Sequence, residues 1–349
     1  MIVSATVDKY LLYIKDLRMT PLLRIIGVIL LTVLALAALI ATGWVTLALW
    51  YRIPGPDAIR GAAAGLWLVF VLATVSFGRK MPLAGLGLFL VSLIAVGIWW
   101  QSIKPSLDRD WATDVSRTVT GTVDNNIVTL HDVRNFNWSS ATTADARWDI
   151  RQYDLNKLDE ADIVLSYWGM DAIAHTLISF GFNDGQRVVF SVETRREKTE
   201  SYSSVAGFFK TYELAFIAAD ERDILYLRTN MRKEDTYLYP LDLPKEAMRA
   251  LFLSYVASAD QLAKKPAFYD TLSTNCTTVV FDLARKIEPG IPMDYRIILS
   301  GYLPGYLVDH DATLWKLPEA QLRARAAISA KAQAAGDSPP DYSATIRQQ

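Results

Sequence analysis

Cysteine and histidine are scarce in this sequence. Its 349 residues contain one cysteine, Cys276, and three histidines. A single thiol cannot form an intramolecular disulfide, and it cannot supply the repeated cysteine spacing of a zinc finger. The net charge is −1, so no strong positive field favours binding to nucleic acid. We therefore predict no metal site and no cofactor, and we look for function in the apolar runs and around Cys276.

The apolar residues are concentrated in three runs near the N-terminus. These runs cover about residues 25–50, 61–78 and 81–100. A helix of about 20 apolar residues crosses a bilayer, and the first run is too long for the apolar core of a cleaved signal peptide. We predict a membrane anchor with three transmembrane helices over residues 1–104, followed by one domain with a C-terminal helix and tail over residues 105–349.

Basic residues predict the orientation of this anchor. Most of them lie before the first run or between the second and the third: Lys9, Lys15, Arg18, Arg24, Arg79 and Lys80. Because cytoplasmic loops are enriched in Lys and Arg, the N-terminus is expected in the cytoplasm. Three crossings then place the domain outside, which in a bacterium means an inner-membrane protein with a periplasmic domain. Trp99 and Trp100 lie where an interfacial aromatic belt is expected.

The domain has the pattern of an α+β fold with a mainly antiparallel sheet and helices packed against it. Strands are predicted in "NNIVTLHDVRNFNW", "IVLSYWG", "AIAHTLISFGF", "RVVFSVETRR", "YELAFIA" and "DILYLRTN". Helices are predicted in "LPKEAMRALFLSYVASADQLAKK", after Cys276, and in "PEAQLRARAAISAKAQAAG". "FNDGQ" predicts a hairpin turn, "ARWDIRQYDLNKLDEAD" a loop with a short connector, and "DSPPDYS" a polar tail.

Cys276 lies at the predicted start of a helix. The apolar residues after it recur at helical spacing: Val279, Val280, Leu283, Ala284 and Ile287. Thr274 or Asn275 can cap this helix. A thiol at a helix N-terminus has a lowered pKa and reacts more readily as the thiolate. The alternative is a small buried structural cysteine, but that residue would more often share the apolar stripe.

A cysteine nucleophile needs a base, and His175 is the best candidate. It lies in a predicted strand, where alternation puts it on the same face as Leu177 and Ser179. A half-buried structural histidine is the alternative interpretation. Glu193, on the next strand, is the predicted third residue that orients the imidazole, with Glu197 as second choice. The other histidines, His131 and His310, are predicted to be peripheral.

Arg195 belongs to the charged stretch "SVETRREKTESYSS". Such a stretch is usually a solvated edge strand and loop. If the strand lines a cleft, Arg195 could hold a carboxylate or a phosphate through two hydrogen bonds. We predict Arg195, Asn275 and Thr277 as substrate-binding residues.

Residues 128–347 resemble the family of the N-terminal periplasmic domain of Lnb, a bacterial lipoprotein N-acyltransferase. The resemblance rests on "VRNFNW", "RQYDL", "HTLISFGFNDG", "SVETRREKTESYS", "YELAFIAADERDILYLRTN", "FYDTLSTNCTT", "IILSGYLP" and "DYSATIR". It implies a circularly permuted papain-like (NlpC-type) fold, in which the histidine precedes the cysteine, and it implies Cys276 as nucleophile and His175 as base. Members of the family are expected to carry membrane helices after this domain, whereas here the apolar runs precede it.

Three functions fit the sequence. The first is acyl transfer through a thioester on Cys276, with a phospholipid or lipoprotein as substrate at the membrane. The second is hydrolysis of an amide or peptide bond in peptidoglycan, and the third is a non-catalytic envelope protein. An acyltransferase is expected to have an apolar groove near Cys276, and a wall hydrolase an open polar cleft.

Overall fold

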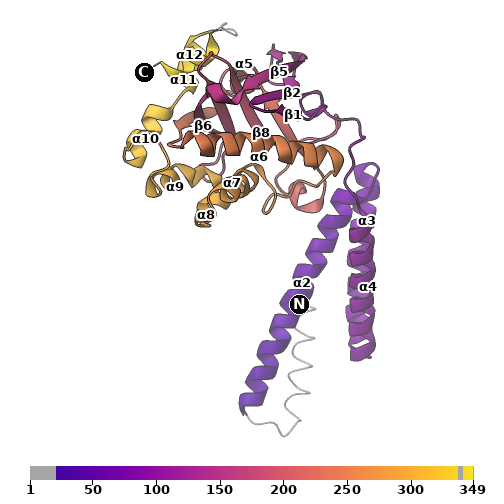
Figure 1. The fold of residues 1–349 in the computed structure, drawn as a ribbon. Coiled ribbons are helices and arrows are strands. Elements are labelled where there is room, and N and C mark those ends of the chain that lie inside the picture. The colour runs from indigo at the N-terminus through magenta and orange to yellow at the C-terminus, as the bar shows by residue number, and fades with distance from the viewer. Residues whose placement is uncertain (1–20, 337–340, 349) are drawn as a thin grey trace. The chain divides into compact units, whose positions relative to one another are not determined.

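The chain forms two compact units, Met1–Lys104 and Pro105–Gln349. The computed structural model describes residues 21–336 and 341–348 (Figure 1). Lys9, Lys15 and Arg18, on which the predicted orientation partly depends, lie outside the described residues. The boundary between the units coincides with the change in composition after the third apolar run.

The first unit contains three helices among its described residues: α2 (Pro21–Arg52), α3 (Asp57–Gly78) and α4 (Pro82–Ser102). Each is long and apolar enough to cross a membrane. α3 packs against both α2 and α4. A Cβ atom on Gly85 would lie 2.5 Å from the Cα atom of Gly78, so the close approach of α3 and α4 at their turn requires glycine.

The second unit is built on one mixed sheet. Its strands among the described residues are β1 (Thr120–Asp124), β2 (Ile127–Arg134), β5 (Trp148–Asp154), β6 (Leu158–Tyr167), β7 (His175–Phe182), β8 (Arg187–Arg195), β9 (Glu213–Ala219) and β10 (Asp235–Pro240). Their order is β1-β2-β9-β8-β7-β6-β10, and β5 pairs with β2. Every pair is antiparallel except β2 with β9. The short strands β3 (Asn137–Trp138) and β4 (Ala144–Asp145) pair separately.

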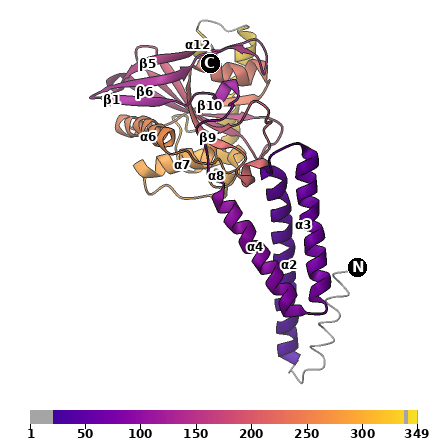
Figure 2. The same cartoon turned by 90° about the vertical axis from the view of Figure 1, so that its right-hand side faces the viewer.

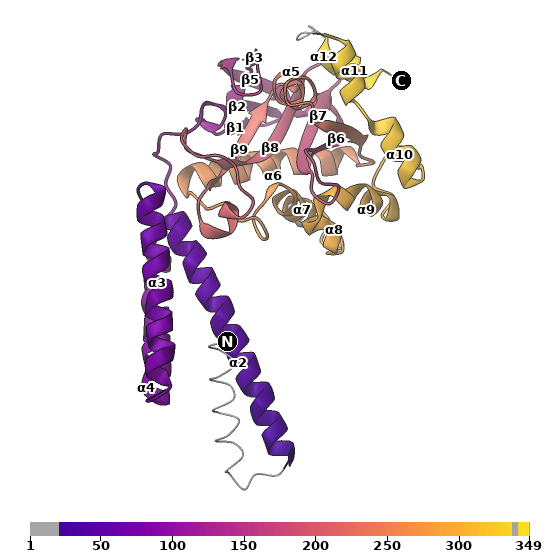
Figure 3. The ribbon, with the colours of Figure 1, turned by 180° about the vertical axis from the view of Figure 1, so that it is seen from behind.

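Helices cover both faces of this sheet (Figure 2). On one face, α6 (Lys245–Lys264) packs Phe252 and Tyr255 against Phe180 and Phe190, and α7 (Cys276–Ile287) follows it. On the other face lie α5 (Glu221–Tyr226), the π-helix η4 (Leu227–Met231), α11 (Ser329–Ala334) and α12 (Tyr342–Arg347) (Figure 3). The other α-helices among the described residues are α8 (Tyr295–Ile298), α9 (Leu303–Asp309) and α10 (Glu319–Ala326).

The segment "DILYLRTN" was predicted as a strand, and this prediction is wrong. It forms α5 and the π-helix η4. Asp220 caps α5 by accepting a hydrogen bond from the N–H of Arg222 at 2.9 Å, which fixes the helix start directly after β9. A short apolar run of this length fits a buried helix as well as a strand. Here the Asp220 cap favours the helix.

Two further segments differ from the prediction. "ARWDIRQYDLNKLDEAD" contains β5 and the start of β6, because Tyr153 is fully buried against Phe182 and Phe252. The C-terminal segment is not one helix, since Ile328 donates its N–H to the carbonyl of Thr236 on β10 at 3.0 Å and separates α10 from α11.

The predicted polar tail also contains structure. Residues 337–340 lie outside the described residues, but α12 follows them. Tyr342 and Ile346 of α12 are buried in the core beside α5. Arg347 pairs with Glu221 and Asp162, and these two ion pairs fix α12 against the sheet.

Candidate active site

Cys276 is the first residue of α7. Asn275 caps the helix, because its side-chain oxygen accepts the N–H groups of Thr277 and Thr278, both at 2.9 Å. The Thr278 hydroxyl accepts the N–H of Asn275 at 2.9 Å and completes a capping box. The cap therefore fixes the thiol at the positive end of the helix dipole.

The Cys276 thiol is buried, with 9% of its surface exposed. Burial raises its pKa, but the charge and hydrogen bond of His175 lower it, with help from the N–H of Thr176 and from Thr277. The result is a lowered pKa. Cys276 therefore has thiolate character at a pH where a free thiol remains protonated.

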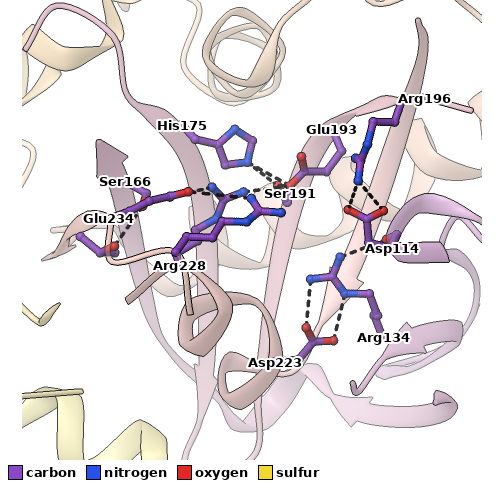
Figure 4. Close-up of polar contacts among 12 residues, drawn as sticks. Asp114, Arg134, Ser166, His175, Ser191, Glu193, Arg196, Asp223, Arg228 and Glu234 are labelled. Atoms are coloured by element: carbon purple, nitrogen blue, oxygen red, sulfur yellow. Dashed lines mark hydrogen bonds and ion pairs between the residues drawn. The ribbon is translucent and has the colours of Figure 1, made fainter. Parts of the chain in front are cut away.

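His175 is the first residue of β7, and Glu193 lies on the neighbouring strand β8 (Figure 4). The Nε2 atom of His175 lies 3.1 Å from Oε1 of Glu193 and 2.8 Å from the Ser191 hydroxyl. Ser191 donates its hydroxyl to the same Oε1 atom at 2.7 Å. Since Nε2 faces these two groups, Nδ1 is the nitrogen left for the thiol.

The pKa values of the histidine and the glutamate move apart. Burial lowers the pKa of His175, but the Glu193 carboxylate opposes it and, with Cys276, raises the value to about 9. Burial raises the pKa of Glu193, yet His175 and Arg228 hold it well below its usual range. The histidine is therefore an imidazolium and the glutamate a carboxylate at neutral pH.

Arg228 connects Glu193 to a second carboxylate, Glu234 (Figure 4). Arg228 of the π-helix η4 donates to Glu193 at 3.2 Å and to Glu234 at 3.1 Å. Ser166 donates its hydroxyl to Glu234 at 2.6 Å. π-Helices occur frequently at functional sites, and this one turns Arg228 toward the carboxylate that contacts His175.

Arg134 and Asp223 form a buried ion pair near these residues (Figure 4). Arg134 donates through Nε and Nη2 to the two oxygens of Asp223, at 2.9 and 3.0 Å. Its Nη1 donates to the carbonyl of Asp114 at 3.0 Å, and Arg196 donates to the Asp114 carboxylate at 2.9 Å.

These groups surround a cavity of about 580 Å³ in the second unit. Cys276, His175 and Glu193 all line it. Its charged wall comes from the arginine and carboxylate side chains, and its other residues are largely uncharged: Trp168, Met170, Ile173, Tyr202, Phe208, Tyr269 and Ile298. The cavity therefore combines the Cys276 thiol with charged, uncharged polar and apolar side chains.

The three residues predicted to bind substrate have internal partners. Arg195 is buried and is not a lining residue of this cavity; it donates to the carbonyls of Val115 and Ser116, at 3.0 and 2.7 Å, and lies over Trp111. Asn275 caps α7, and the hydroxyl of Thr277 lies 2.8 Å from that of Thr176. This geometry corrects the predicted role of Arg195, because its guanidinium is held by the carbonyls of Val115 and Ser116, whereas Glu193 and Arg196 line the cavity.

The alternative candidates lie elsewhere. Glu197 pairs with Arg109 at 3.1 Å, His131 lies on β2, and His310 follows α9 and is exposed. Among residues 21–336 and 341–348, no three His, Cys, Asp or Glu side chains gather as a possible metal site. Four charged residues around the site were not predicted: Arg134, Asp223, Arg228 and Glu234. The first three lie in stretches that carry the family resemblance, but no spacing within those stretches indicates a role for them.

Comparison with known proteins gives one match. The family model of the Lnb N-terminal periplasmic domain matches residues 144–301, a range that contains His175, Glu193 and Cys276. No curated protein and no solved structure matches the chain. The part of the chain that contains this site is therefore similar to the Lnb N-terminal periplasmic domain family.

Proposed function

We propose that the second unit is a thiol enzyme that transfers an acyl group through a thioester on Cys276. The observation that carries the proposal is the 3.1 Å contact between His175 and Glu193 in the cavity that Cys276 lines. A nucleophile, a base and a group that orients the base are the three parts of a cysteine acyl-transfer site.

The reaction follows from these groups. The Cys276 thiolate attacks the carbonyl carbon of an ester, and the positive end of the α7 dipole stabilises the oxyanion that forms. When the tetrahedral intermediate collapses, the carbon–oxygen bond breaks and the His175 imidazolium gives its proton to the leaving alkoxide. An acceptor amine then attacks the thioester, His175 takes the proton of that amine, and the thiolate leaves.

The walls of the cavity favour acyl transfer over hydrolysis of peptidoglycan. A wall hydrolase needs an open polar cleft for a sugar and peptide polymer, whereas this cavity has an apolar side with aromatic residues such as Trp168, Tyr202 and Phe208. The helices α2, α3 and α4 fit a membrane anchor, which would keep the enzyme beside lipid substrates. We infer a phospholipid or a lipoprotein as substrate, and peptidoglycan is the alternative.

The order of the site residues along the chain agrees with a permuted papain-like arrangement. His175 comes before Cys276, the histidine lies on a strand and the cysteine begins a helix. The proposed location is the bacterial inner membrane, with the N-terminus in the cytoplasm and the second unit in the periplasm. Arg79 and Lys80, in the turn between α3 and α4, would then face the cytoplasm.

Mass spectrometry of the full chain tests the proposal. After incubation with phospholipid vesicles, intact mass is expected to show an acyl adduct, which must be on Cys276 if it is a thioester because the chain has one thiol. His175→Ala is expected to abolish the adduct, and the matched variant His310→Ala is expected to keep it. Wild-type protein that acquires no adduct from phospholipid or lipoprotein, or a Cys276→Ala protein with full function in cells, would contradict acyl transfer.

A further inference from the structure

The segments that border the cavity beside Cys276 contain no charged side chain. Residues 201–209, 271–281 and 297–308 include no Asp, Glu, Lys or Arg, although charged residues make up 21% of the chain. Each segment supplies lining residues of the cavity, among them Tyr202, Thr271 and Ile298. The absence of charge is therefore a property of one side of this cavity.

Hydrogen bonds hold these segments together. The hydroxyl of Thr271 donates to the carbonyl of Ser204 at 2.8 Å. The hydroxyl of Ser300 donates to the carbonyl of Ala174 at 2.6 Å, which connects the third segment to the loop that follows β6. One hydrogen bond therefore joins the first two segments, and the other joins the third segment to the loop before β7.

Large apolar side chains on this border are exposed. We call this set the apolar mouth, and it consists of Trp168, Met170, Val205, Phe208, Leu272 and Ile298. Each exposes between 38% and 62% of its surface. Trp168 and Met170 lie in the loop after β6, where the exposed Asp171 follows Met170, and the other members of the set come from the uncharged segments. Exposed apolar side chains that gather around a cavity mark a surface that contacts a partner or a membrane.

We propose that the apolar mouth inserts into the surface of the lipid bilayer, so that acyl chains reach the cavity without crossing water. The delivery of acyl chains to the cavity rests on the proposed function, whereas the insertion of the apolar mouth into the bilayer does not depend on it. Trp and Tyr are enriched at the depth of lipid headgroups. The apolar mouth contains Trp168, and the bordering segments contain Tyr202 and Tyr302.

The length of the connection to the anchor supports a bilayer as the occupant. The candidate membrane helix α4 ends at Ser102, and the second unit begins at Pro105. Three extended residue steps span only about 10 Å. Such a short tether keeps the bilayer at a high effective concentration for any apolar surface of the second unit, whereas a protein partner would have to compete with it.

A depth measurement in vesicles tests the insertion. Because Cys276 is the one thiol, full-length Cys276→Ser is a cysteine-free background. Val205→Cys and Leu272→Cys place a fluorescent NBD label on the apolar mouth, at side chains 45% and 52% exposed. Val123→Cys and Ile150→Cys on β1 and β5 are matched controls, at side chains 49% and 68% exposed. Each protein is reconstituted into phosphatidylethanolamine–phosphatidylglycerol vesicles that carry spin-labelled lipid.

At both mouth positions, the expected result is a blue shift of the NBD emission and quenching by spin-labelled lipid. Neither effect is expected at the two control positions. Equal quenching at all four positions, or none at the mouth, would overturn the inference. A blue shift at the mouth without quenching would identify a protein contact and would also overturn it. The readout is depth and not turnover, so insertion can fail while acyl transfer holds, and the reverse.

Discussion

Two carboxylates, the buried Asp223 and the half-buried Glu193, pair with arginines that line the same cavity, but their surroundings differ. Asp223 accepts four hydrogen bonds, two from Arg134, one from the N–H of Phe136 at 2.9 Å and one from the indole of Trp138 at 2.7 Å. Its two oxygens share these donors evenly. These donors to Asp223 are backbone, indole or guanidinium N–H groups, and none of them is a histidine whose protonation the carboxylate could change.

Glu193 is arranged differently. His175, Ser191 and Arg228 all approach the same oxygen, Oε1. One of these three, His175, is the residue whose protonation the carboxylate shifts. The comparison shows that an ion pair in the interior can stabilise the fold or tune the site. A carboxylate whose two oxygens are fully occupied by hydrogen-bond donors, such as Asp223, indicates a role in the fold.

Removal of the saturated carboxylate is expected to have the largest effect on stability. Asp223→Ala leaves Arg134, which is 3% exposed, as an uncompensated buried charge, at a cost of about 3–5 kcal/mol. Thermal unfolding of the full chain in detergent measures the loss. Asp132→Ala is the control, because Asp132 pairs with Arg117 on the surface, where an ion pair contributes about 0–1 kcal/mol. Equal losses in the two variants would show that Asp223 has no special place in the fold.

Removal of the charge of Glu193 is expected to affect the reactivity of the Cys276 thiol more than the stability of the fold. Glu193→Gln eliminates the main group that raises the pKa of His175, so the imidazolium weakens and the pKa of Cys276 rises. If that rise is about one unit, alkylation of Cys276 by iodoacetamide slows about tenfold at neutral pH. Glu197→Gln is the matched control, since Glu197 pairs with Arg109 and not with His175. An unchanged rate in Glu193→Gln would separate Glu193 from the site.

The smallest effect is expected at Arg228. This cation lowers the pKa of His175 directly, yet it also fixes the carboxylate that raises that pKa. The two consequences of Arg228→Gln oppose each other, so the alkylation rate is expected to change by about threefold or less. Arg196→Gln, which loses its bond to Asp114, is the control within the same cavity. A change as large as that in Glu193→Gln would show that the two consequences of losing Arg228 do not offset each other.

The central part of the site was predictable because it depends on local rules. The capping residue, the helical spacing after Cys276 and the alternation around His175 are all visible in the sequence. The "FNDGQ" turn fixes the hairpin of β7 and β8, in which Leu177 lies opposite Ser191. The same register, continued by two residues, brings His175 opposite Glu193, which explains why the strand pattern led to this glutamate.

The outer part of the site depends on contacts between distant segments. Arg228 reaches Glu193 only because residues 227–231 form a π-helix, and the apolar letters of that segment fit a strand equally well. Arg134 and Asp223 meet across 89 residues of sequence. Arg195 was chosen by its charge, whereas its neighbour in the sequence, Arg196, lines the cavity.

The pH dependence of Cys276 alkylation tests the central claim most directly. The thiolate is the reacting form, so the rate rises as pH increases through the pKa of Cys276. The imidazolium of His175 persists up to about pH 9, and over that range it stabilises the thiolate. The account predicts an inflection below the free-thiol value of about 8.5, which moves upward in His175→Ala. An inflection at or above that value in the wild-type chain, unmoved in His175→Ala, would contradict the thiolate–imidazolium pair.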